Sequence, residues 1–102
     1  MVDVELNDLR REFLDEARDK VDEMQSALER APETAIERIT YLAHQLKGAG
    51  GSYGYQRISA DAAALETALE KRSGDGAALD PQIQQYVVSL RSEIDRCARE
   101  LA

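Results

Sequence analysis

The stretch that decides the fold reads His44-Gln45-Leu46-Lys47-Gly48-Ala49-Gly50-Gly51-Ser52-Tyr53-Gly54. It contains the only histidine of the chain and four of its six glycines. A glycine inside a helix costs about 1 kcal/mol relative to alanine. If the segment is helical, Gly48, Gly50 and Gly51 together cost about 3 kcal/mol of the roughly 5–15 kcal/mol that stabilises a small domain. These glycines therefore indicate a role other than stability.

Length and composition predict one all-α domain over residues 1–102. The chain is long enough for a single modest core. It is rich in Ala, Leu, Glu and Arg and poor in aromatic residues, which is typical of helices packed on helices. No apolar run approaches the roughly 18 residues of a membrane span, and the N-terminus lacks the layout of a signal peptide. We therefore expect a cytoplasmic protein that does not associate with membranes.

The single cysteine and single histidine exclude a disulfide framework, a zinc site and a metal or haem bundle, so we expect no bound metal or cofactor. A net charge of −7 argues against a general nucleic-acid binder. The charge is also unevenly placed. Residues 38–60 contain Arg38, Lys47 and Arg57 but no acid. The chain is acidic except around its histidine.

Apolar residues that recur every three or four positions predict the first two helices. The first covers about 25 residues, and Asn7-Asp8 can cap a fresh start, which allows a short extra helical turn at the N-terminus. Pro32 ends this helix, and the Thr-Ala-Ile-Glu capping box at residues 34–37 starts the second. Gly54 stops the second helix because glycine adopts the left-handed conformation without penalty. The apolar series of the first helix is Leu6, Leu9, Phe13, Ala17, Val21, Met24 and Leu28.

The same rhythm predicts two more helices. The third carries Ile58, Ala62, Leu65 and Leu69 inward and ends in the Ser-Gly-Asp-Gly stretch at residues 73–76. The fourth is capped by Asp80, has Pro81 in its first turn and continues to Leu101. Four amphipathic helices joined by short connections predict an antiparallel four-helix bundle.

The second helix presents its histidine beside its buried face. At about 100° per residue, the inward positions are Ile36, Ile39, Ala43, Leu46 and Gly50, and His44 lies next to them toward solvent. The missing side chains of Gly48 and Gly51 leave the imidazole above bare backbone, so a partner can approach it closely. Lys47 places an ammonium group one turn away, where it can meet an anion carried on the ring. Thr40 and Tyr41 are the neighbours of His44 on the preceding turn of the helix surface.

The pattern H-x-L-K-G-x-x-x-x-x-G resembles the signature of histidine-containing phosphotransfer (HPt) domains, which are similar to the phosphoacceptor domain of chemotaxis histidine kinases. The resemblance implies that His44 is phosphorylated, that Lys47 contacts the phosphoryl group and that Gly48 makes room for a receiver domain. Glu66 stands where the family often has Gln or Glu, which implies that it accepts a hydrogen bond from Nδ1 and leaves Nε2 as the nucleophile. The partner-binding surface then includes Thr40, Tyr41, Gln45, Gly48, Gly51, Ser52 and Arg57, while Gly50 and Gly54 are structural.

The resemblance implies a phosphocarrier rather than an enzyme. It would relay a phosphoryl group between receiver domains of response regulators and hybrid histidine kinases, with Mg²⁺ supplied by the receiver. No phosphate-binding loop of the G-x-x-x-x-G-K-S/T kind occurs in the chain. Two alternatives stay open: the phosphoacceptor domain of a chemotaxis-type kinase, and a receiver-binding module that is not phosphorylated. The starting methionine and the absence of a linker favour a free-standing protein, which we expect to be a monomer.

Two further groups of residues have simpler interpretations. Packing at the rim of the bundle explains the tyrosines at positions 41, 53 and 55 more readily than catalysis does. Cys97 continues the apolar stripe of the last helix, which predicts a buried and unreactive thiol.

Overall fold

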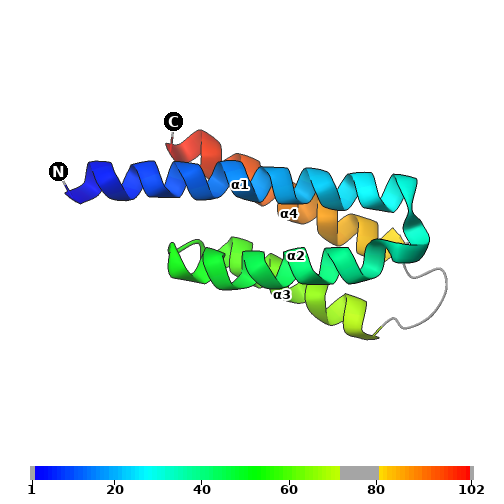
Figure 1. Ribbon diagram of the computed structural model, residues 1–102. Helices are drawn as coiled ribbons and strands as arrows, with labels where there is room; N and C mark the ends of the chain where they lie inside the picture. Colours follow the sequence, from blue (N-terminus) through cyan, green and yellow to red (C-terminus); the bar gives the residue numbers. More distant parts are fainter. Residues whose placement is uncertain (1, 72–80, 102) are drawn as a thin grey trace.

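The computed structural model describes residues 2–71 and 81–101, and it confirms the all-α class. Its helices are α1 (Val2–Arg30), α2 (Pro32–Ser52), α3 (Gln56–Lys71) and α4 (Pro81–Leu101). Each helix packs on the next along the chain, and α4 returns to pack on α1. In Figure 1, α1 and α4 lie along one side of the molecule and α2 and α3 along the other. This arrangement is the antiparallel four-helix bundle that the sequence predicts.

The buried core contains most of the predicted apolar series, while Leu6, Leu28 and Ile36 are only partly buried. Leu9 is exposed although Leu6, one turn nearer the N-terminus, is partly buried, so Leu9 stands at the edge of the buried face of α1. In Figure 1, the N-terminal end of α1 extends past the ends of the other helices. Leu14 and Leu42 are buried although they stand outside the predicted series. The buried core consists of Phe13, Leu14, Ala17, Val21, Met24, Ala35, Ile39, Leu42, Ala43, Leu46, Ile58, Ala62, Leu65, Leu69, Ile83, Val87, Leu90, Ile94 and Cys97.

The predicted starts of the first two helices are wrong. Helix α1 is continuous from Val2 through Asn7 and Asp8, so these two residues do not cap a fresh start. Helix α2 begins at Pro32 after Ala31, which makes no side-chain cap. Thr34 lies inside the first turn, where its hydroxyl donates to the Ala31 carbonyl at 3.4 Å. Proline fits the first helical position because no backbone N–H is needed there, which proline lacks, and because its φ is already helical. The helix therefore starts before the predicted capping box.

The turn after α2 is built as the sequence predicts. Gly54 has φ +84°, a conformation that favours glycine. The N–H of Tyr55 donates to the Gly50 carbonyl at 2.8 Å, and that of Gly54 donates to the Gly51 carbonyl at 3.2 Å, which is a Schellman motif. Phe13 of α1 stacks on Tyr53 and Tyr55, so the turn is fixed against the bundle. The predicted end of the third helix and the Asp80 cap lie outside the described residues.

Candidate functional site

One carboxylate joins the histidine of α2 to the lysine one turn further along. Glu66 of α3 accepts a hydrogen bond from His44 Nδ1 through Oε2 and another from Lys47 Nζ through Oε1, both at 2.8 Å. The Glu66 side chain is only 13% exposed, whereas that of His44 is 67% exposed. The three side chains therefore form a connected group whose carboxylate is covered and whose imidazole faces solvent.

The charge of Glu66 decides which nitrogen of His44 is free. The hydrogen bond from Lys47 lowers the pKa of the Glu66 carboxyl, and the bond to His44 acts in the same direction, while burial opposes both. Glu66 is therefore ionised near neutral pH, and an ionised carboxylate only accepts hydrogen bonds. Nδ1 must then carry the hydrogen. In the neutral ring, Nε2 keeps its lone pair and is available as a nucleophile.

The glycines that follow His44 have different surroundings. A Cβ atom added at Gly48 would meet nothing within 4 Å, and one at Gly51 would be 3.7 Å from Ser59 Oγ. One at Gly50 would lie 3.1 Å from the backbone nitrogen of Ser59, which is closer than ordinary contact. Gly50 therefore lets α3 approach α2, whereas Gly48 leaves open space beside the imidazole.

Ser59 reinforces this close approach of α2 and α3. Its hydroxyl donates to the Lys47 carbonyl at 2.8 Å. Residue 47 is therefore tied to α3 twice: its backbone carbonyl accepts from Ser59, and its ammonium group donates to Glu66. Sequence analysis missed both the Ser59 contact and the pairing of Lys47 with Glu66, because neither helix shows from its own periodicity which of its turns faces the other.

The other residues predicted on α2 lie on its surface around His44. Thr40 is half-buried, and its hydroxyl donates to the Ile36 carbonyl at 2.7 Å. The Ser52 hydroxyl donates to the Gly48 carbonyl at 3.2 Å. Tyr41 and Gln45 are exposed, and Gln45 Nε2 donates to the Tyr41 hydroxyl at 2.9 Å. The surface of α2 around His44 is therefore polar, and its hydroxyl and amide groups already make hydrogen bonds within the helix.

Arg57 is not brought to His44. It precedes Glu66 by nine residues on α3, which is about two and a half turns and places it on the opposite side of that helix. It lines a hollow between α3 and α4 together with Asp61, Glu93 and Arg96. Burial and the charge of Glu93 raise the pKa of Asp61 there. The position of Arg57 in the acid-free part of the sequence did not show which side of α3 it occupies.

A second group built on a carboxylate lies within α4 and was not predicted. Glu93 is buried and accepts hydrogen bonds from Arg96, one of them from Nε at 3.1 Å, and from Cys97 Sγ at 3.5 Å. The hydrogen bonds from Arg96 lower the pKa of Glu93. Burial raises the pKa of the Cys97 thiol to about 11, so this thiol stays protonated and unreactive near neutral pH.

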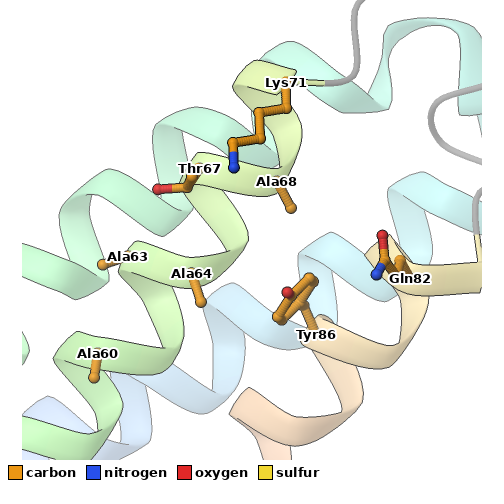
Figure 2. Close-up of a pocket in the computed structure, with 8 residues that line it drawn as sticks. All are labelled: Ala60, Ala63, Ala64, Thr67, Ala68, Lys71, Gln82 and Tyr86. Carbon is orange, nitrogen blue, oxygen red and sulfur yellow. The ribbon is translucent and has the colours of Figure 1, made fainter.

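A hollow of about 740 Å³ between α3 and α4 offers little chemistry (Figure 2). Its α3 wall consists mainly of alanines, and Tyr86 and Gln82 stand on the α4 side. Among the residues that the structure describes, Lys71 is the charged one in its lining, and His44 is not part of it. Within residues 2–71 and 81–101, no three His, Cys, Asp or Glu side chains are grouped to hold a metal ion.

Comparisons with known proteins give one result. A family model described as the Hpt domain matches residues 8–100. Neither the curated proteins nor the solved structures gave a match. In the part of the chain that the structure describes, no helix is both long enough and apolar enough to span a membrane.

Proposed function

Because the chain belongs to the Hpt domain family, which serves histidine phosphotransfer in two-component signalling, we propose that His44 carries a phosphoryl group between aspartyl-phosphate receiver domains. The observation that supports this most directly is the exposed imidazole whose Nδ1 is bonded to Glu66 at 2.8 Å. It leaves Nε2 as the atom that meets a partner. Hpt domains are phosphocarriers rather than kinases, and we propose that this protein likewise acts without an ATP site.

The proposed transfer needs only an oriented ring on this side. The Nε2 lone pair attacks the phosphorus of the aspartyl phosphate, the bond from phosphorus to the carboxylate oxygen breaks, and the free aspartate carboxylate leaves. The imidazole becomes a phosphorylated imidazolium that keeps its hydrogen on Nδ1. Glu66, being ionised, stabilises that positive charge through the existing hydrogen bond. The reverse sequence delivers the phosphoryl group to the next receiver.

Lys47 has two parts in this proposal. In the free protein its ammonium group holds Glu66 in the ionised state and so fixes the hydrogen on Nδ1. Its side chain is 39% exposed, so it can also turn toward a phosphoryl group on the ring. Phosphoryl transfer depends mainly on positioning and on neutralising charge, and this flexible cation serves both needs.

Access to His44 is provided by the glycines. The open space beside Gly48 allows the surface of a receiver to approach the imidazole without meeting a side chain. We propose that the receiver supplies both the acceptor aspartate and Mg²⁺. The absence of acids from residues 38–60 fits this partner, since further carboxylates near His44 would repel an acidic metal pocket.

The test is to incubate the protein with a panel of phosphorylated receiver domains and Mg²⁺. We expect the wild type to gain an acid-labile, alkali-stable phosphate, and His44→Gln to gain none. Phosphate gained only from an ATP-binding kinase domain would favour the chemotaxis-kinase alternative. Binding to receivers without any phosphate gain would favour a module that is not phosphorylated.

A further inference from the structure

The side of His44 opposite Glu66 holds an exposed aromatic ring. Tyr41 precedes His44 by one turn of α2 and is 54% exposed. Within residues 5–71 and 81–101, apart from Pro32 and Glu33, the other exposed large hydrophobic residues are Leu9 and Val88. Leu9 lies on α1, and Val88 lies on α4. Tyr41 is therefore the member of this group that stands beside the imidazole.

The ring of Tyr41 is already held in place in the free protein. The Arg38 guanidinium lies over the ring, 5.4 Å from its centroid. Arg38 is fixed in turn by two hydrogen bonds to Glu23 of α1, one of them from Nη2 at 3.1 Å. Gln45 Nε2 donates to the Tyr41 hydroxyl at 2.9 Å. Contacts to both the face and the hydroxyl of one exposed aromatic reduce the conformational entropy that it loses on binding a partner.

We propose that Tyr41 is a docking anchor for the receiver domain that exchanges the phosphoryl group with His44. Tyrosine is enriched among the few residues that dominate the energy of protein interfaces. Tyr41 lies on the α1 side of His44, because Arg38 contacts both its ring and Glu23 of α1. Lys47 lies on the α3 side, where it donates to Glu66. The two sides of His44 thus have separate tasks: Glu66 and Lys47 orient the ring and neutralise charge, and Tyr41 holds the partner.

The surroundings of Tyr41 specify the chemistry of the receiver surface. The ring requires an apolar pocket, and Arg38 beside it favours acidic groups at the edge of that pocket. Glu23 of α1 already pairs with Arg38, so an acidic group of the receiver at this edge would share the guanidinium with Glu23. We assign this pocket to the receiver surface beside its phosphorylated aspartate, because Tyr41 lies only one helical turn from His44. This inference rests on the proposed function.

The experiment uses a receiver domain that has been shown to phosphorylate the wild-type protein. The affinity of that receiver in its unphosphorylated form is measured by titration calorimetry, and the transfer rate is measured in single turnovers at saturating receiver. Tyr41→Ala is expected to weaken binding by about thirtyfold, the effect of a dominant interface residue, and to leave the saturating rate unchanged. Tyr41→Phe keeps the ring and should bind within about threefold of wild type, because only the modest Gln45 hydrogen bond is lost.

Val88→Ala is the matched control, since it shortens an exposed hydrophobic residue away from His44 and should alter neither quantity. Circular dichroism of each variant establishes that the helices are intact. Wild-type affinity in Tyr41→Ala, or a lower saturating rate with unchanged affinity, would overturn the inference. If the wild type accepts phosphate from no receiver, the proposed function itself fails. If it accepts phosphate and Tyr41→Ala binds normally, only the docking role fails.

Discussion

Glu66 and Glu93 are two almost buried glutamates with the same kind of partners, and they differ in what surrounds them. Each accepts hydrogen bonds from a cation and from a nucleophilic side chain: Lys47 and His44 for Glu66, Arg96 and Cys97 for Glu93. In both, the hydrogen bond from the cation is the largest cause of a lowered pKa. The direction and cause of the pKa shift therefore do not distinguish a functional group from a structural one here.

The difference lies in exposure and in the number of helices involved. Glu93 and its two partners belong to α4, and Cys97 is 5% exposed with a raised pKa. Glu66 links α3 to α2, and its histidine faces solvent beside the open backbone of Gly48. A buried carboxylate with two partners is therefore compatible with a purely structural role. The accessible nucleophile and the missing side chains distinguish the candidate site.

The largest expected difference between the two groups is in the effect of replacing the nucleophilic side chain. His44→Gln should abolish phosphate acceptance and leave the melting temperature almost unchanged, because the side chain is mostly exposed. Cys97→Ser should leave acceptance intact, because the thiol is buried and protonated. Labelled phosphate retained by each variant at alkaline pH gives the comparison. Acceptance by His44→Gln would remove the functional distinction between the two groups.

The next effect concerns the open backbone. Gly48→Leu should fold about 1 kcal/mol more stably, as helix propensity predicts, yet slow the transfer by about a hundredfold because it displaces the partner from the reactive geometry. Gly50→Ala is the contrasting variant. Its added Cβ lies 3.1 Å from the Ser59 backbone nitrogen, so an overpacking penalty of about 1–3 kcal/mol should offset the roughly 1 kcal/mol gained in helix propensity, and the variant should not share the stabilisation of Gly48→Leu. Urea denaturation and single-turnover transfer measure both, and a normal rate in Gly48→Leu would contradict the role of the open space.

Neutralising each glutamate should separate chemistry from stability. Glu66→Gln keeps an acceptor for Nδ1 but loses the charge that stabilises the phosphorylated ring, so the transfer should slow by about tenfold, the difference between a charged and a neutral hydrogen bond. Glu93→Gln should leave the rate unchanged and lower the free energy of unfolding by about 1–3 kcal/mol. Transfer kinetics and denaturation of both variants test this. Equal effects of the two variants on the rate would show that the groups are not distinct.

The smallest expected effect is on the pH dependence of stability. Both glutamates have folded-state pKa values below their unfolded values. Their contribution is therefore present above about pH 4.3, the ordinary glutamate pKa, and is lost as pH falls through the folded values. The melting temperature of wild type should fall below that pH, and the double variant Glu66→Gln, Glu93→Gln should show a shallower fall. Identical slopes would mean that other carboxylates control the acid transition.

The sequence predicts the helices better than their starts. Apolar periodicity identifies four helices because each buries one face, and Gly54 marks a true end because only its backbone conformation closes that turn. The capping box was predicted to start the second helix, but Pro32, which was predicted to end the first, is the first residue of α2. The exposure of Leu9 depends on where the neighbouring helices cover α1, which its own periodicity does not encode, since Leu6 of the same series is partly buried.

Within the candidate site, spacing along one helix places His44, Lys47 and Gly48 together. Glu66 comes from another helix, and only the resemblance to a family pointed to it. Two features depend on how α2 and α3 are rotated against each other. One is the contact of Glu66 with Lys47, and the other is the position of Arg57 away from His44. A pattern within a single helix carries no information on that rotation.

The exposure of His44 has a consequence for the lifetime of a signal. A phosphoryl group on Nε2 would stand on the open side of the ring, where water reaches it as readily as a receiver does. Retention would then depend on the intrinsic rate of P–N hydrolysis and on how soon a receiver arrives.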